Sequence, residues 1–286
     1  MVSKKASRFI IPFLLLLLLP QGRVLAGESF PRGDVFTPLF ADPKEIRSTI
    51  DYLWVSAGSY HAPVVLVGFG EHLGFLRWKG GPGGAAWQLG MTAGVFAQFK
   101  MDTLTKELIN TDFFVGFPLT WRLGGTSARF RVYHQSSHLG DKFLMGFPVP
   151  RANLSYESSE LLLSQDIGKL RLYTGGEWYF ARYPSEVNPW VFHSGLEFRA
   201  PFHRSQVPSK RDAHWVTAVD AKTTKDGVTI TGFDFKSGFE FGPIENTDRN
   251  SRRWSFTAEY YTGPLPYSQF FTQRIFYYGL GFQLSN

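Results

Sequence analysis

The fold class depends most on the end of the chain, Phe276-Tyr277-Tyr278-Gly279-Leu280-Gly281-Phe282-Gln283-Leu284-Ser285. Large apolar residues fill the even positions, and the odd positions include two glycines, a glutamine and a serine. Because successive side chains of a β-strand point to opposite faces, this pattern predicts a strand with one apolar face. The apolar face continues to the end of the chain, which favours a closed barrel, in which the last strand pairs with the first.

The same alternation recurs along most of the chain. Examples lie at residues 87–99, 109–121, 170–180, 190–198, 233–241 and 254–260. We count about twelve such segments, most of them long enough for the roughly 9–11 residues of a tilted membrane-spanning strand. The sequence therefore predicts an all-β fold, an antiparallel transmembrane β-barrel of about twelve strands. The ending Tyr277-x-Gly279-x-x-Phe282-x-Leu284 also resembles the closing-strand signal of outer-membrane barrels.

The composition agrees with this fold class. Aromatic residues make up 17% of the chain, charged residues only 19%, and there are 29 glycines, a balance unusual for a soluble α/β enzyme. A soluble β-sandwich is the alternative, but aromatic residues near the strand ends are typical of an interfacial girdle. The absence of cysteine excludes disulfides and thiolate catalysis.

The first 26 residues have the pattern of a secretory signal peptide. A positive start precedes the apolar run Phe9–Leu19, and Val24-Leu25-Ala26 offers a cleavage site after Ala26. The alternative is a retained anchor, for which the run is short, since a spanning helix needs about 20 apolar residues. We expect an irregular, proline-rich periplasmic lead-in at residues 27–47 and the barrel at residues 48–286.

The net charge gives no sign of a nucleic-acid partner. The chain carries +6, but four of its 30 basic residues and none of its acidic residues lie in the predicted signal peptide. The remaining 26 basic and 24 acidic residues leave only +2, too little for a nucleic-acid footprint.

The candidate chemistry lies in Arg131-Val132-Tyr133-His134-Gln135-Ser136-Ser137-His138-Leu139-Gly140-Asp141. His134 and Ser136 share a strand face with Phe130 and Val132, so they are expected on the lipid-facing wall. From a periplasmic N-terminus this strand is the fifth and runs outward, which puts the pair near the extracellular rim. A serine hydroxyl beside a histidine base is the usual arrangement of an activated nucleophile.

The His134-Gln135-Ser136 run resembles a motif of two families, outer-membrane phospholipase A and lipid A 3-O-deacylase. Both place a His-x-Ser pair on the barrel exterior at the level of the outer leaflet. In both, the third member of the triad follows the serine by twelve residues, a position that is Pro148 here. Asn153 and Glu157, on the next predicted strand, are the candidates for that role. The phospholipase resemblance also implies that calcium and dimerisation should be tested.

Over a longer span the chain resembles a bacterial family called domain of unknown function 1207. The resemblance rests on Pro38-Leu39-Phe40-Ala41-Asp42-Pro43-Lys44-Glu45 and on the stretch from Tyr133 to Asp141. It implies an envelope protein and no particular activity.

Two functions follow from these patterns. The leading interpretation is a non-catalytic outer-membrane barrel, with a structural, binding or narrow-channel role in a Gram-negative-type bacterium. The alternative is an integral outer-membrane lipid acyl hydrolase that uses His134 and Ser136. No cofactor or metal is expected, apart from calcium under the hydrolase alternative. The expected partners are outer-membrane lipids and the barrel-assembly machinery, and the sequence leaves the oligomeric state open.

Overall fold

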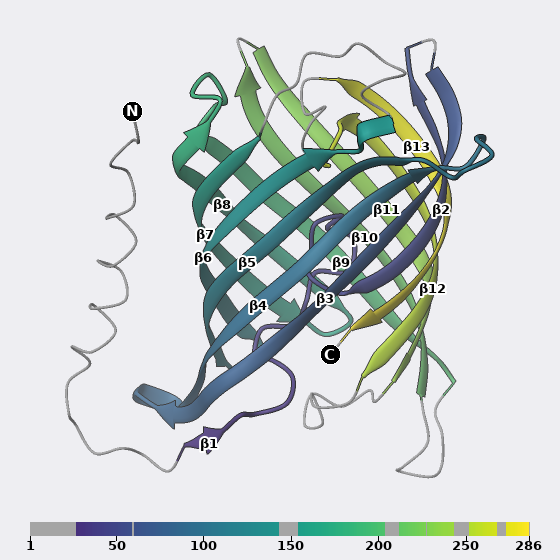
Figure 1. The fold of residues 1–286 in the computed structure, drawn as a ribbon. Helices are drawn as coiled ribbons and strands as arrows, with labels where there is room; N and C mark the ends of the chain where they lie inside the picture. The colour runs from purple at the N-terminus through teal and green to yellow at the C-terminus, as the bar shows by residue number, and fades with distance from the viewer. Residues whose placement is uncertain are drawn as a thin grey trace, which may run out of the picture.

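The computed structural model describes residues 27–58, 60–142, 154–203, 212–226, 228–242, 252–267 and 273–285 (Figure 1). Nearly all of the described chain is β-strand. The strands are β1 (Glu28–Ser29), β2 (Ser48–Ala57), β3 (Tyr60–Gly80), β4 (Ala85–Lys100), β5 (Leu108–Leu123), β6 (Thr126–Leu139), β7 (Ser155–Ile167), β8 (Leu170–Tyr183), β9 (Trp190–His203), β10 (Asp212–Asp226), β11 (Val228–Gly242), β12 (Arg253–Pro264) and β13 (Arg274–Ser285).

Strands β2 to β13 form a closed antiparallel barrel of twelve strands, which confirms the predicted fold class. Each strand pairs with the next one along the chain, and β13 pairs back onto β2. In this last pairing Leu284 lies opposite Ser48 and Phe276 lies opposite Ser56. The alternating segment at the end of the chain is therefore the one that closes the ring.

The two ends of the barrel differ. The start of β2 and the end of β13 lie together, and we call this end the terminal end. Tight connections such as Gly124-Gly125 and Gly168-Lys169 also lie there. The connection at residues 184–189 lies at the opposite end, which we call the loop end. β6 is the fifth strand of the barrel, as predicted, and runs from the terminal end to the loop end.

The barrel is apolar outside and charged inside. Among outward side chains, Phe69 is 76% exposed and Leu280 is 66% exposed, whereas the inward carboxylates of Glu160 and Glu197 are fully buried. This distribution is the reverse of that in a soluble sandwich with an apolar core. An apolar outer wall of this extent fits the hydrocarbon of a bilayer.

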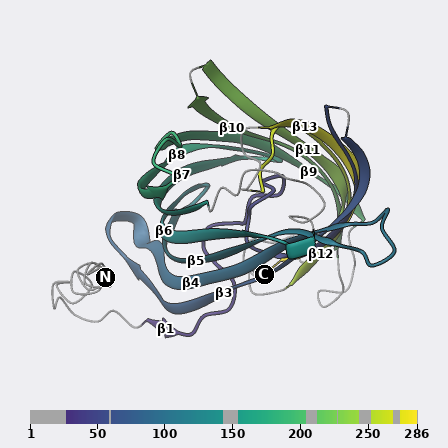
Figure 2. The ribbon, with the colours of Figure 1, turned by 45° about the horizontal axis from the view of Figure 1, so that its top comes forward.

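The segment predicted as an irregular lead-in has no strand beyond β1, which pairs with β3. Its remainder, residues 31–47, lies inside the ring of strands (Figures 1 and 2), and we call it the plug. Six apolar side chains of the plug are buried: Val35, Phe36, Leu39, Phe40, Ala41 and Ile46. The lumen is thus filled by the chain's own N-terminal segment. The predicted signal peptide lies outside the described residues.

Candidate functional site

His134 and Ser136 lie on the outer face of β6, as predicted. The residues that alternate with them, Tyr133, Gln135 and Ser137, are buried toward the lumen. Ser136 is three residues from the end of β6, so the pair lies close to the loop end. Period-two alternation therefore places both polar side chains on the wall that carries the apolar belt.

Glu157 of β7 lies directly opposite His134 in the register of the two strands. Oε1 of Glu157 is 3.3 Å from Nδ1 of His134, and both side chains are about one third exposed. A carboxylate at this distance holds the ring and selects the tautomer that leaves Nε2 free to accept a proton. Glu157, one of two candidates predicted for this role, is thus beside the histidine; Asn153, the other, lies outside the described residues.

Ser136 completes the outward cluster. Within the part of the chain that the structure describes, no hydrogen bond joins its hydroxyl to the His134 ring. Same-face residues of one strand are separated by about 6.5 Å of backbone, a gap that two side chains can bridge by turning toward each other. Catalytic hydrogen bonds often tighten only when substrate binds, so this separation still permits a serine–histidine pair.

On the β5 side the surroundings of the pair are apolar, whereas on the β7 side Glu157 and Ser155 are polar. Across β5, Val115 lies opposite His134 and Phe113 lies opposite Ser136. Both are outward and 40–46% exposed. The Phe113 ring also contacts the His138 ring edge-on, at 5.8 Å between centroids. A molecule that reaches Ser136 from the β5 side therefore arrives over an apolar surface.

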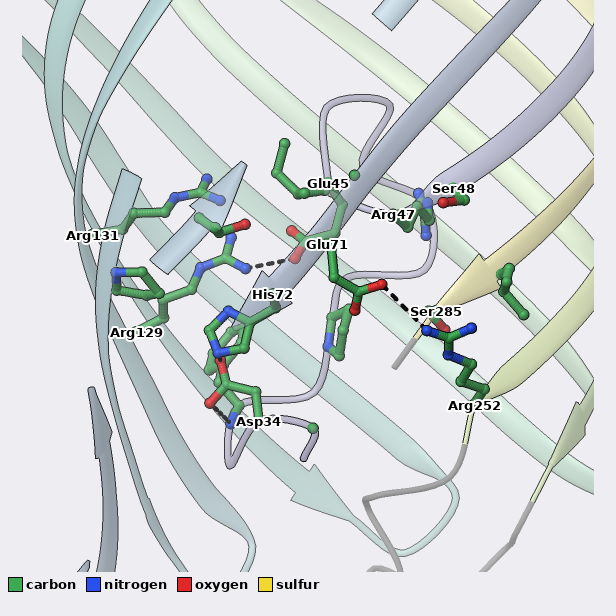
Figure 3. A pocket seen from close by; sticks show the side chains of 18 residues that line it. Asp34, Glu45, Arg47, Ser48, Glu71, His72, Arg129, Arg131, Arg252 and Ser285 are labelled. Carbon is green, nitrogen blue, oxygen red and sulfur yellow. Dashed lines mark hydrogen bonds and ion pairs between the residues drawn. The ribbon is translucent and has the colours of Figure 1, made fainter. Parts of the chain in front are cut away.

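The lumen holds a second concentration of charged groups, around the plug (Figure 3). Arg129 of β6 donates to Glu45 of the plug at 2.7 Å and to Glu160 of β7 at 2.8 Å. Nearby, Oδ2 of Asp34 lies 3.4 Å from Nε2 of His72. A cavity of about 40 Å³ remains beside these groups, which leaves room for little more than water.

Aromatic and backbone contacts also hold the plug in the lumen. The guanidinium carbons of Arg129 and Arg171 each lie 4.9 Å from the centroid of the Phe36 ring. Arg47 donates to the carbonyl oxygens of Leu39 and Asp42, which folds the plug back on itself. In the sequence, Pro38–Glu45 shows only a family resemblance. Large apolar residues within a proline-rich segment were the signal that this segment is buried.

One luminal cluster has the composition of a metal site. Glu160, Glu177 and His193 each offer a ligand atom within 4.8 Å of the others. Their charges are already matched, since Arg129 and Arg131 pair with Glu160, and Lys222 lies 3.6 Å from Glu177. We therefore interpret this cluster as part of the ion-pair network that lines the lumen.

Comparison with known proteins agrees with these features. The family model described as protein of unknown function DUF1207 matches residues 19–285. The chain belongs to this family. No curated protein sequence matches it. In the described part of the chain, no helix has the length and apolarity to cross a membrane.

Two solved structures share the fold at low sequence identity. Outer membrane phospholipase A from Escherichia coli is 12% identical, with a TM-score of 0.56 and coverage of 87% of this chain and 93% of that one. The Salmonella typhi outer membrane phospholipase, solved as a dimer with bound calcium, is also 12% identical, with a TM-score of 0.56 and coverage of 89% and 98%. The DUF1207 chain therefore has the fold of outer-membrane β-barrels.

Proposed function

We propose that this DUF1207 protein is a lipid acyl hydrolase of the outer membrane, with its active site on the outer wall of the barrel. The observation that carries the proposal is the contact between Glu157 and His134, two residues along the same outward face from Ser136. The sequence favoured a non-catalytic barrel because a His-x-Ser pair arises often by chance and because no residue could be matched as the support of the histidine. Glu157 supplies that support, and so the hydrolase becomes the better proposal.

The proposed chemistry assigns one role to each residue. Nε2 of His134 takes the proton of Ser136 while the serine oxygen bonds to the carbonyl carbon of a lipid ester. The ester C–O bond then breaks, and the leaving alcohol takes the proton from His134. Water, activated by the same nitrogen, hydrolyses the acyl-serine and releases the fatty acid. Glu157 acts as a positioning residue that holds the ring and stabilises its protonated form.

The location supports a lipid substrate. The triad lies on an apolar wall near the loop end, where an ester at the edge of the bilayer can reach it without leaving the membrane. The fold likeness to the two phospholipases supports an outer-membrane setting. We propose further that the protein is surrounded by outer-membrane lipids and inserted by the barrel-assembly machinery.

The test is fatty-acid release from phospholipid by the purified, refolded chain, with calcium or with a chelator. Ser136→Ala should abolish release, and Glu157→Gln should lower kcat on the order of 10²-fold or more. Ser159→Ala is a matched control, because Ser159 also lies on the outer face of β7 but opposite Val132. No release with or without calcium, or equal release by Ser136→Ala, would return the protein to the non-catalytic interpretation.

A further inference from the structure

A cavity of about 280 Å³ lies in the loop end of the lumen, on the other side of the wall from Ser136. The plug and strands from both sides of the barrel contribute to its lining. Aromatic rings and carboxylates dominate the lining, among them Asp42, Tyr156, Tyr179, Asp234 and Tyr261. Cavities of this size and concave shape are the usual sites of small ligands.

The lining has an excess of negative charge. Five carboxylates, those of Asp42, Glu177, Glu186, Asp220 and Asp234, face three basic side chains, those of Lys44, Arg131 and Lys222. The three basic side chains already have acidic partners: Asp112 for Lys44, Glu160 for Arg131, and Asp42 and Glu177 for Lys222. From outside the lining, His193 pairs with Asp220 at 2.6 Å, so an additional cation would offset part of the negative charge that remains.

Asp234 is the carboxylate that most needs such a cation. Its side chain is almost fully buried, its carboxyl group lies against that of Glu259, and among the described residues no N–H or hydroxyl donor reaches either of its oxygens. The nearest ammonium group, that of Lys236, is 3.9 Å away. One oxygen of Asp42 is also buried without a hydrogen-bond partner in the described chain. A buried carboxylate without a donor is costly, so such groups usually mark a site filled by a ligand, an ion or water.

The aromatic rings of the lining favour a cation as well. Tyr261 lies directly opposite Asp234 in the pairing of β11 and β12, and Tyr156 and Tyr179 stack with ring centroids 4.2 Å apart. Elsewhere in this lumen, rings already bind cations: Lys44 lies 4.8 Å from the centroid of Phe96. Within the described residues, no side-chain cation lies over Tyr156, Tyr179 or Tyr261.

We infer that this cavity binds a small primary alkylammonium ion. The ammonium group donates to Asp234 and offsets its charge, and the alkyl group packs against the tyrosine rings. Both interactions strengthen in a buried site, where water screens them least. This site is independent of the proposed hydrolase, because it lies inside the barrel and shares no residue with the outward triad.

The test compares butylamine, which is charged at neutral pH, with butan-1-ol, its neutral counterpart of similar size. Binding to the full, refolded chain in a non-ionic detergent is followed by saturation-transfer NMR and calorimetry. Butylamine should bind saturably, and the alcohol at least about tenfold more weakly, since one charge interaction of this kind is worth about a factor of ten. Equal binding of the two, or no saturable binding, overturns the inference and leaves water in the cavity.

Three variants assign the binding to this cavity. Asp234→Asn removes the negative charge and keeps the size of the side chain. It should weaken butylamine binding about tenfold while leaving the binding of butan-1-ol unchanged. Tyr261→Leu should also weaken the binding of butylamine more than that of butan-1-ol. This variant provides the test if Asp234→Asn does not fold. Asp102→Asn is the control, because Asp102 is an exposed carboxylate at the loop end outside the cavity. Unchanged affinity in both cavity variants contradicts the assignment.

Discussion

Oε1 of Glu45 lies 2.7 Å from a guanidinium nitrogen of Arg129, although the two residues are 84 positions apart in the sequence. The contact joins the plug to β6. The same guanidinium also binds Glu160 of β7, so one cation balances a carboxylate from the plug and another from the wall. All three groups are buried, which makes their pairing important for the stability of the fold.

Replacing Arg129 should therefore destabilise the protein strongly. Arg129→Met leaves Glu45 without its cation, and breaking a buried pair in this way costs about 3–5 kcal/mol. The control is Arg252→Met, which removes an ion pair with Glu71 in which both side chains are more than half exposed. Exposed pairs contribute about 1 kcal/mol or less. Urea unfolding of both refolded variants measures the difference, and similar losses would mean that the plug contact contributes little.

The plug should respond to pH through Asp42. Burial acts to raise the pKa of this carboxyl, but the charges of Lys222 and His193 outweigh it and hold the pKa well below its usual value. A depressed pKa contributes stability above the unfolded value of about 3.9, and this contribution is lost as the pH falls below it. Asp42→Asn should thus lower the thermal midpoint at pH 7. The difference in thermal midpoint between this variant and the natural chain should become smaller below about pH 4. If the difference in thermal midpoint stays constant from pH 7 to pH 3, the charge of Asp42 is not its cause.

The filled lumen predicts that the intact barrel conducts ions poorly. In planar bilayers the full chain should show no stable conductance steps. Deletion of residues 31–46 removes the side chains that occupy the lumen, and stable steps should then appear. Heat-modifiable gel migration confirms that the deleted form is still a barrel. Large, steady conductance from the intact chain would show that the plug leaves an open path.

The closing strand should be essential for insertion. Phe282 and Leu284 lie on the outer face of β13, opposite Ile50 and Ser48 of β2. Replacing both with Asp puts charges on the lipid face, at a cost of about 2–4 kcal/mol each near the midplane and less near the interface. The double variant should fail to appear in heat-modifiable form in outer-membrane fractions. Ser285→Asp, at the end of the same strand, is the control and should insert normally.

Several features follow from the sequence alone because they depend on local geometry. Alternation with a period of two fixes which side chains share a face, so it predicts the number of strands and the apolar outer wall. It also places His134 and Ser136 on the outside, near the end of the fifth barrel strand, without any knowledge of the neighbouring strands.

Other features depend on groups that are distant in the sequence, and only the tertiary structure decides them. Whether Glu157 meets His134 depends on the register between β6 and β7, and a shift of one residue would have turned Glu157 to the lumen. The same holds for Asp234 and Tyr261 across β11 and β12. The sequence of the plug has no periodicity from which burial could be predicted. Phe36 is buried because Arg129 and Arg171, from separate strands, converge on its ring. Local alternation thus determines the wall, whereas the contents of the lumen and the contact of Glu157 with His134 arise only when the barrel closes and brings distant strands together.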